Sequence, residues 1–283
     1  MAETLEYTEE NIKTLEGVEH IRLRPGMYIG KLGDGSHPED GIYVLIKEVI
    51  DNSIDEFRMG AGKVIDVTVK DGKVSVRDYG RGIPLGKLLD CVSILNTGAK
   101  YDSKAFKKSV GLNGVCTKAV NALSWKFSAQ SFRNGETRRI EFKQGKLDSD
   151  SGVIKADGNV PQGTLIEFEP DSSKGLFENY AFRDEFIEPM MRNYSYLNTG
   201  LTINYNGQKF NSKNGLWDLL TENFAKEQIE PLYPIIHLKG EDIEIVLTHT
   251  EQIGEEYFFF FFCQQTPNEG PLELADRVAI GSP

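Results

Sequence analysis

The segment Gly41–Met59 carries three polar side chains at helical spacing. Glu48, Asn52 and Glu56 stand at i, i+4 and i+8, so in a helix they share one face, beside the apolar positions of the same segment. Mg²⁺ takes oxygen ligands and keeps its waters, which suits Asn52, and Glu48 one turn away would polarise a water for attack on a phosphorus atom. A solvated acidic helix face explains the same pattern, and on this helix alone it is the favoured interpretation.

Asp78 stands at the end of an alternating strand pattern. Val74, Val76 and Asp78 point to one face of a strand, so the carboxylate continues an apolar face and would lie in a pocket. A buried carboxylate needs a hydrogen-bond donor, and the amino group of adenine is one candidate. In the glycine-flanked turn that follows, Arg81 would either lie over the base or pair with Glu56. The alternative is an ordinary surface turn after a strand.

Glycines recur in the stretch before the next expected helix. Gly98–Lys100 is followed by Gly111–Gly114 and then by Val115–Lys118. Glycines directly before a helix expose N–H groups that bind phosphate, the helix dipole adds to this attraction, and Lys100 supplies a positive charge. Further on, the hydroxyl of Thr164 at a strand start would assist recognition of a base. Each of these signals is weak alone, because flexible glycine loops are common.

The elements around these motifs alternate between helical and strand patterns. We expect residues 1–40 to form an irregular arm with a turn at Arg24–Gly26, and hairpin turns at Asp71-Gly72 and Asn206-Gly207. Helices are expected at Gly41–Met59, Leu85–Asn96, Val115–Leu123, Phe182–Leu197 and Leu216–Ala225. Strands are expected at Val64–Val69, Lys73–Asp78, Lys126–Arg133, Glu136–Gln144, Val153–Ala156, Gly163–Pro170, Leu201–Tyr205, Ile235–Leu238, Ile243–Thr250 and Tyr257–Cys263. The pattern predicts an α+β fold, a two-layer sandwich in which helices cover a mixed, mostly antiparallel sheet.

A polar stretch at Ser212–Gly215 marks the expected boundary between two units. Residues 1–212 would form the larger unit with its N-terminal arm, and residues 213–283 the second. About 70 residues is short for the helix and strands expected there, so we predict that the second unit is incomplete.

The chain is acidic, with a net charge of −11. Such a domain should not hold a nucleic-acid backbone by general electrostatics, so any action on DNA would need another chain or domain. A nucleotide can still bind, because backbone N–H groups and a metal supply local positive potential. Three cysteines without a CxxC pair and a polar N-terminus favour a reducing cytoplasm, and no apolar run of about 18 residues predicts a membrane span.

In their order and spacing these motifs resemble the GHKL (Bergerat) ATPase fold shared by type II topoisomerase B subunits, the ninety-kilodalton heat-shock chaperones, mismatch-repair ATPases and sensor histidine kinases. Within this superfamily the motifs are most similar to those of the topoisomerase branch. Arg24–Gly30, Glu48–Glu56, Asp78–Pro84 and Val120–Ser124 are similar to segments of the B subunit of bacterial DNA gyrase or topoisomerase IV. The resemblance covers residues from about 10 to 265.

The resemblance implies a role for each matching residue, with ATP and Mg²⁺ as cofactors. Glu48 matches the catalytic base, Asn52 the magnesium ligand and Asp78 the residue that recognises the adenine amino group, with Thr164 assisting through a water. Tyr7 falls in an arm that reaches a second B subunit, and the second unit resembles the start of a transducer domain. The remaining positions expected to contact the nucleotide, the lid over its phosphates or an inhibitor are Asp55, Glu56, Arg81, Gly82, Ile83, Pro84, Lys100, Gly111, Asn113, Gly114, Val115, Cys116, Thr117 and Arg133.

The implied function is the ATPase module of a bacterial type II topoisomerase. ATP-driven dimerisation of two B subunits would be coupled to strand passage, with the A subunit as partner and DNA contacted through the holoenzyme. The resemblance also implies binding of adenine-mimicking and aminocoumarin inhibitors, with Arg133 as a contact. Asn113 favours topoisomerase IV over gyrase. The alternatives are a nucleotide-gated clamp of a chaperone or mismatch-repair branch and a non-catalytic nucleotide-binding scaffold.

Two departures from the family pattern limit the expected activity. Cys116 stands where the lid pattern has its third glycine, and a side chain there would crowd the phosphates. The lysine with which the family's transducer domain contacts the γ-phosphate has no clear counterpart. We therefore expect this chain alone to bind ATP and to hydrolyse it weakly.

Overall fold

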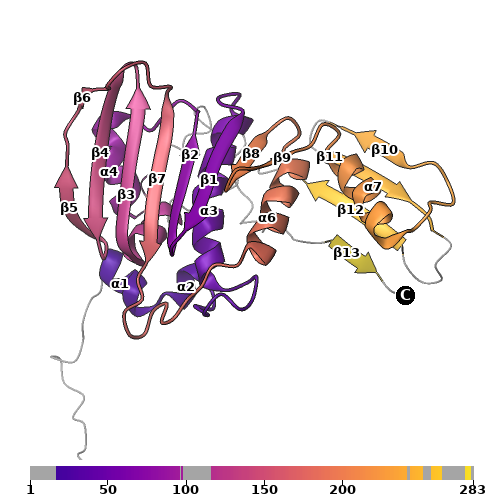
Figure 1. The fold of residues 1–283 in the computed structure, drawn as a ribbon, viewed down its shortest axis with the longest axis horizontal. Coiled ribbons are helices and arrows are strands. Elements are labelled where there is room, and N and C mark those ends of the chain that lie inside the picture. Colours follow the sequence, from indigo (N-terminus) through magenta and orange to yellow (C-terminus); the bar gives the residue numbers. More distant parts are fainter. Residues whose placement is uncertain are drawn as a thin grey trace, which may run out of the picture.

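A computed structural model describes residues 17–95, 97, 116–240, 243–250, 256–262 and 278–281. At residue 116 and in the last two ranges it describes the backbone alone. The chain forms a large sheet with helices on one side, followed by a smaller sheet with one helix, and the two lie side by side (Figure 1). The predicted α+β class, a mixed and mostly antiparallel sheet covered by helices, is confirmed.

The larger sheet has nine strands, and all but one of its pairings are antiparallel. The exception is the parallel pair of β1 and β8, in which Val64 lies opposite Thr202. The strands, in spatial order, are β5 (Lys146–Asp150), β4 (Glu136–Lys143), β3 (Ser124–Arg133), β7 (Gly163–Pro170), β2 (Lys73–Asp78), β1 (Val64–Lys70), β8 (Thr202–Tyr205) and β9 (Gln208–Asn211), with β6 (Ile154–Lys155) paired to β4. This order places the end of β2 directly beside the start of β7, so residues from distant parts of the sequence meet there.

Helices cover one face of this sheet and share its core. The longest, α3 (Gly41–Arg58), buries apolar residues at intervals of three and four, including Ile42, Leu45, Ile46, Val49 and Ile50. The others in this layer are α1 (Gly17–Leu23), α2 (Gly26–Ile29), the 3₁₀ turn η2 (Leu85–Lys87), α4 (Leu88–Ser93) and α5 (Cys116–Ala122). Helix α6 (Asp184–Leu197) packs beside β8 and β9 at the edge nearer the second unit (Figure 1). The layered arrangement places one face of α3 above the ends of β2 and β7.

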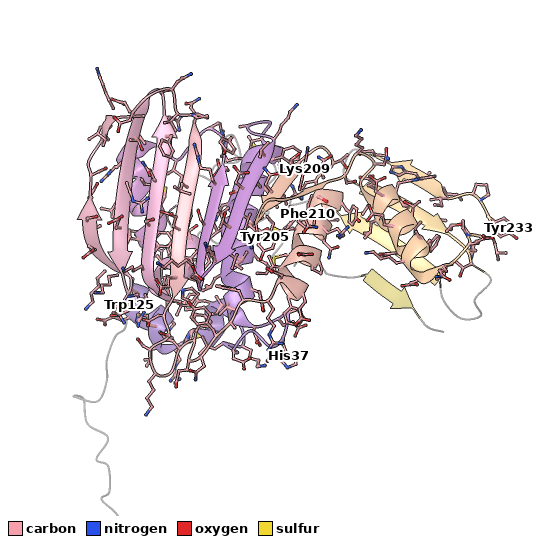
Figure 2. All side chains as sticks on the ribbon, viewed as in Figure 1. His37, Trp125, Tyr205, Lys209, Phe210 and Tyr233 are labelled. Atoms are coloured by element: carbon pink, nitrogen blue, oxygen red, sulfur yellow. The ribbon has the colours of Figure 1, made fainter. Side chains whose placement is uncertain are left out.

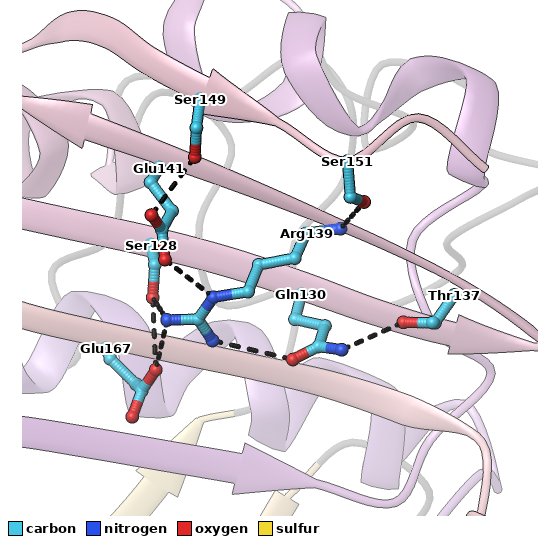
Figure 3. A network of polar contacts seen from close by, with 8 residues as sticks. All are labelled: Ser128, Gln130, Thr137, Arg139, Glu141, Ser149, Ser151 and Glu167. Atoms are coloured by element: carbon cyan, nitrogen blue, oxygen red, sulfur yellow. Dashed lines mark hydrogen bonds and ion pairs between the residues drawn. The ribbon is translucent and has the colours of Figure 1, made fainter. Parts of the chain in front are cut away.

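The opposite face of the sheet carries polar side chains, and none of the described helices lies over it (Figure 1). Arg139 on β4 lies at the centre of a network there: it donates to Glu141 Oε1 at 2.9 Å and Ser128 Oγ at 3.0 Å, and it forms an ion pair with Glu167 at 2.9 Å (Figure 3). A hollow of about 720 Å³ crosses the same face over β1, β2, β7, β3 and β4. Antiparallel sheets commonly have one face packed against the core and the other exposed to solvent, as here.

The second unit has a four-stranded sheet and its own apolar cluster. The cluster contains Leu216, Leu220 and Phe224 of α7 (Leu216–Glu227) with Val246 of the sheet. The strands are β10 (Ile236–Lys239), β11 (Ile243–Thr248), β12 (Glu256–Phe262) and β13 (Val278–Gly281), all antiparallel.

Glu222 of α7 joins the second unit to the first, because Tyr196 Oη of α6 donates to it at 2.5 Å and Arg192 pairs with it at 3.5 Å. Figure 2 shows Tyr205 and Phe210 near this junction and Tyr233 at the far end of the molecule. The two sheets and clusters are compatible with the expected boundary near residue 212, which stays a prediction.

Most predicted elements form within a few residues of their expected limits. The two hairpin turns have the positive φ angles that primed turns require, at Asp71 (52°) and Asn206 (46°) and at the glycines that follow them. Three differences stand out. The expected irregular arm contains α1 and α2, because Pro25 lies at the N-cap of a short helix rather than in an open turn. Strands β5, β9 and β13 were not predicted, and the expected helix Leu85–Asn96 is a 3₁₀ turn joined to a shorter helix. In the part of the chain that the structure describes, no helix has both the length and the apolar character needed to cross a membrane.

Candidate functional site

The polar stripe of α3 lies at the edge of the buried face of that helix. Glu48, Asn52 and Glu56 are all half-buried. Asn52 Nδ2 donates to the carbonyl of Glu48 at 2.8 Å and to Thr117 Oγ1 at 3.0 Å. These bonds fix the amide, so that Asn52 Oδ1 is the atom able to ligate a cation. Because Thr117 belongs to the first turn of α5, the stripe adjoins the helix that follows the glycine-rich segment.

Asp78 lies at the end of β2 on the face that packs against α3. Its side chain is 6% exposed, and the adjoining inward positions Val74 and Val76 are fully buried. Oδ1 accepts from the backbone N–H of Gly80 at 2.9 Å and of Thr164 at 3.2 Å. Oδ2 has no hydrogen bond among the described residues, so it is the oxygen able to accept from a ligand.

Burial dominates the ionisation of Asp78. Desolvation raises the pKa of its carboxyl group to about 6, against the lowering effect of the Gly80 and Thr164 hydrogen bonds. The negative charge of Glu56 raises it further. A strongly perturbed carboxyl group in a layered α+β core is typical of a functional site.

The turn after β2 is fixed against α3. Arg81 donates to Glu56 through Nε at 3.0 Å, Nη2 at 2.8 Å and its backbone N–H at 2.9 Å. At Gly80 a Cβ atom would lie 2.7 Å from Glu56 Cβ, so glycine is required for this close approach. Of the two positions considered for Arg81, the structure shows the pair with Glu56.

The next three residues pack on the end of β3. Gly82 has φ +75°, and a Cβ atom there would lie 2.7 Å from the carbonyl oxygen of Phe132. Ser131 Oγ donates to the carbonyl of Ile83 at 2.7 Å, and Arg133 Nη1 donates to that of Gly82 at 3.1 Å. Pro84 then leads into η2. The ends of β2, β3 and β7 and one face of α3 therefore meet around Asp78.

The structure brings together the predicted residues of α3, β2, β3 and β7. Asp55 is buried on α3 at 1% exposure, and Thr164 at the start of β7 is 7% exposed. Thr117 is joined to Asn52, and Cys116 begins α5, where its backbone alone is described. The expected lid and arm positions Tyr7, Lys100, Gly111, Asn113, Gly114 and Val115 lie outside the described residues.

The sequence did not indicate two side chains that hold the backbone around Asp78 through hydrogen bonds. Ser131 holds the Ile83 carbonyl, and Arg77 on the opposite face of β2 contacts three backbone carbonyls. Both lie in strands whose alternation indicates only whether they point inward or outward, so no spacing signal could have assigned them. Among the described residues no group of three His, Cys, Asp or Glu side chains forms a metal cluster.

Residues 37–172 match the family described as histidine kinase-, DNA gyrase B- and HSP90-like ATPases. This segment contains Glu48, Asn52, Asp78 and Thr164, and it forms a domain of that ATPase family.

The chain as a whole is related to B subunits of type II topoisomerases. It is 49% identical over 274 residues to the B subunit of DNA topoisomerase 4 from Borreliella burgdorferi, a match that covers 97% of this chain and 45% of that protein. It is 35% identical over 290 residues to the B subunit of DNA gyrase from Campylobacter jejuni, covering 97% of this chain and 36% of that protein.

A solved structure supports the same relationship. The 43K ATPase domain of Thermus thermophilus gyrase B, in complex with an aminocoumarin, matches with a TM-score of 0.64 at 27% identity. The match covers 86% of this chain and 63% of that one. The chain spans less than half the length of the two topoisomerase subunits named above.

Proposed function

We propose that this chain is the ATP-binding and ATP-hydrolysing module of a bacterial type II DNA topoisomerase. The observation that carries the proposal is the buried Asp78 carboxylate, which two backbone N–H groups orient at the end of β2 beside the polar stripe of α3. A buried acceptor next to a half-buried acidic helix face fits an adenine amino group and a phosphate chain. The kinship with topoisomerase B subunits supports the same assignment.

Within this proposal each described residue has a distinct task. Asp78 Oδ2 accepts a hydrogen bond from the adenine amino group, while Thr164 assists at the base edge. The Glu56–Arg81 pair and the segment Gly82–Pro84 form the walls beside the base, and Asp55 supports α3 from its buried side. Lys100 and the segment Gly111–Thr117 would close over the phosphates.

The donor set fits a magnesium ion, because Asn52 offers a neutral amide oxygen and Mg²⁺ favours oxygen ligands and retained water. When bound, the ion would neutralise charge on the phosphate oxygens. Glu48, one helical turn away, would orient a water and take its proton as that water attacks the terminal phosphorus atom, while the bond to the bridging oxygen breaks and ADP leaves with that oxygen.

The similarity to topoisomerase B subunits supports a proposal for the assembly. We propose that two copies of the B subunit dimerise when ATP binds, that an A subunit completes the enzyme in the cytoplasm, and that residues 213–283 begin the unit that transmits closure. DNA would be contacted through the holoenzyme rather than through this acidic domain, and we favour topoisomerase IV as the parent enzyme.

The matching gyrase B structure holds an aminocoumarin. We therefore propose that Arg133 and Asp78 contact such inhibitors in this chain.

Glu48→Ala tests the catalytic assignment. Because the variant lacks the base that takes the proton of the attacking water, we expect ATP turnover to fall by about 100-fold or more while ATP binding persists. Turnover per chain, followed by phosphate release at increasing protein concentration, also shows whether activity requires a dimer. Glu39→Ala, on an exposed residue before α3, is the matched control and should leave turnover unchanged. Unchanged hydrolysis in Glu48→Ala would instead favour another base or a scaffold without catalysis by this residue.

A further inference from the structure

Arg77 lies on the outward face of β2, immediately before Asp78. Its Nη1 donates to the carbonyl of Asp78 at 2.5 Å, and its Nη2 donates to the carbonyl of Pro161 at 2.6 Å, with a longer contact to that of Gln162 at 3.5 Å. The guanidinium group therefore joins the end of β2 to the segment that enters β7. Figure 1 shows that these two strands are neighbours in the sheet.

Two aromatic rings hold the guanidinium group in place. Arg77 Cζ lies 4.9 Å from the ring centroid of Tyr79 and 4.6 Å from that of Phe132. Tyr79 is itself anchored, since its hydroxyl donates to Asp66 Oδ2 at 2.6 Å. A planar cation between two rings loses little further freedom when it forms its hydrogen bonds, so Arg77 can fix the two backbone segments firmly.

Gly163 shows how closely the joined segments approach. A Cβ atom at this position would lie 2.1 Å from the carbonyl oxygen of Asp78 and 2.6 Å from Arg77 Nη1, and φ is +134°. Only glycine allows the start of β7 to lie directly against the end of β2. The next residue, Thr164, then donates its N–H to Asp78 Oδ1 at 3.2 Å. The contacts of Arg77 on one face of the sheet thus support the orientation of the Asp78 carboxylate on the other.

We propose that Arg77 is a positioning residue for base selection: it holds Asp78 and Thr164 in register, so that Asp78 Oδ2 accepts from the amino group of adenine. The inference rests on the proposed ATP-binding function and deepens it. Because its guanidinium group lies on the outward face, Arg77 acts through the backbone and does not touch the nucleotide. When these contacts are lost, the segment 161–163 is released and the Thr164 N–H no longer fixes the carboxylate.

ATP and ITP separate this role from a general loss of stability. ITP carries an oxygen where ATP carries the amino group, so a well-oriented carboxylate favours ATP and repels ITP. For Arg77→Gln we expect ATP affinity to fall roughly tenfold, and the preference for ATP over ITP to fall by a similar factor, as expected for losing charge-assisted hydrogen bonds that hold the acceptor. Arg77→Lys keeps the charge but lacks the planar fork that reaches two carbonyls, so it should restore only part of the preference.

The pH dependence of ATP binding gives a second readout. The Thr164 N–H and the positive charge of Arg77 both lower the pKa of Asp78, whereas the charge of Glu56 raises it, so the pH midpoint of binding should move upward in Arg77→Gln. Arg77→Lys keeps the positive charge, so an upward shift in that variant reports the loss of the Thr164 hydrogen bond alone. Arg139→Gln is the matched control, because Arg139 lies on the same outward face in a polar network that does not include Asp78 or Thr164 (Figure 3). It should lower the thermal unfolding midpoint without changing nucleotide preference or the pH midpoint.

The experiment measures ATP and ITP binding by calorimetry for the parent chain and the three variants. If the parent chain does not prefer ATP, the proposed recognition by Asp78 fails, whatever Arg77 does. If the parent prefers ATP and Arg77→Gln retains the same preference and pH midpoint as Arg139→Gln, the role of Arg77 is overturned. If Arg77→Gln does not fold, Arg77→Lys decides, and parental selectivity in that variant would reject the proposal.

Discussion

Asp78 carries a charge that its buried surroundings oppose, and the proposed recognition of adenine requires that charge. Burial raises its pKa to about 6, so at neutral pH the carboxylate is ionised at a cost to the fold. An acid with a raised pKa contributes stability that is complete below its ordinary pKa of 3.8 and is lost as the pH rises through about 6. The binding of an amino group has the opposite dependence, because only the ionised form offers two acceptor oxygens.

The protonation of Asp78 should make ATP binding depend on pH. We expect the affinity for ATP to fall as the pH decreases through about 6, since protonated Asp78 presents a hydroxyl group in place of an acceptor. Titration calorimetry across this range measures the effect. An ATP affinity that does not change with Asp78 protonation would argue against its contact with the base.

The substitution Asp78→Asn tests the same group without a change of pH. If the amide oxygen keeps the bonds to Gly80 and Thr164, the amide nitrogen takes the place of Oδ2 and opposes the amino group of the base. We expect weaker binding of ATP and of adenine-mimicking inhibitors, a flat pH dependence, and an unliganded fold that is no less stable at neutral pH. Asp90→Asn on α4, where Asp90 pairs with Lys87 at the surface, is the control and should change none of these.

Among the elements, α1 shows how a short helix is held without a long apolar face. Arg22 Nη2 contacts Asp171 Oδ2 at 2.6 Å, and Arg22 Nη1 donates to the carbonyl of Ala122 at 2.7 Å. Asp171 also accepts from Gln144 Nε2 at 3.0 Å and from Ser173. Burial opposes its charge, but these hydrogen bonds outweigh burial and hold the pKa of Asp171 below its ordinary value. The Asp171 carboxylate therefore joins α1 to the β4–β5 turn and the end of β7, and Arg22 extends the connection to the end of α5.

Removing this carboxylate should detach α1 from the rest of the layer. We predict that Asp171→Ala lowers the free energy of unfolding by about 3 kcal/mol, because Arg22 and Gln144 lose a buried acceptor. Denaturant unfolding at neutral pH, where the carboxylate is fully ionised, measures the change. Glu185→Ala breaks an exposed ion pair with Arg183 and should change stability by no more than about 0.5 kcal/mol. Similar effects of the two substitutions would contradict the anchoring role of Asp171.

The sequence predicted elements with strong periodicity and missed those defined by their partners. Alternation through Val74 and Val76 correctly placed Asp78 on a buried face. Strand β5 has no apolar alternation and is exposed throughout, so only its pairing with β4 defines it. Helix α1 depends on Asp171, which lies 149 positions away from Arg22.

The same limit applies to the candidate site. Residues with a motif, such as Asp78 and Arg81, could be singled out in advance, whereas Arg77 and Ser131 act through backbone carbonyls, most of them in segments distant in the sequence. Such contacts depend on the strand order and the register, which no local pattern contains.

At the scale of the molecule, charge separates nucleotide binding from DNA binding. The net charge of −11 repels a DNA backbone, whereas the proposed nucleotide site relies on local groups. We predict that this chain alone does not bind duplex DNA at low micromolar concentration and about 0.15 M salt, while it still binds ATP. Fluorescence anisotropy with a labelled duplex measures this, and ATP binding by the same preparation is the control. Salt-dependent DNA binding in that range would contradict the assignment of DNA contacts to the rest of the holoenzyme.

The parallel pair of β1 and β8 has a consequence for how the protein is made. Val64 pairs with Thr202, so the ribosome must add about 140 residues after β1 before that strand acquires its second neighbour. At a rate of synthesis of about 5 to 20 residues per second, this edge of β1 stays unpaired for roughly 7 to 30 seconds. During that interval the nascent chain exposes a ready template for pairing with another chain. The larger sheet is therefore completed late in synthesis, after all residues of the candidate site have already been translated.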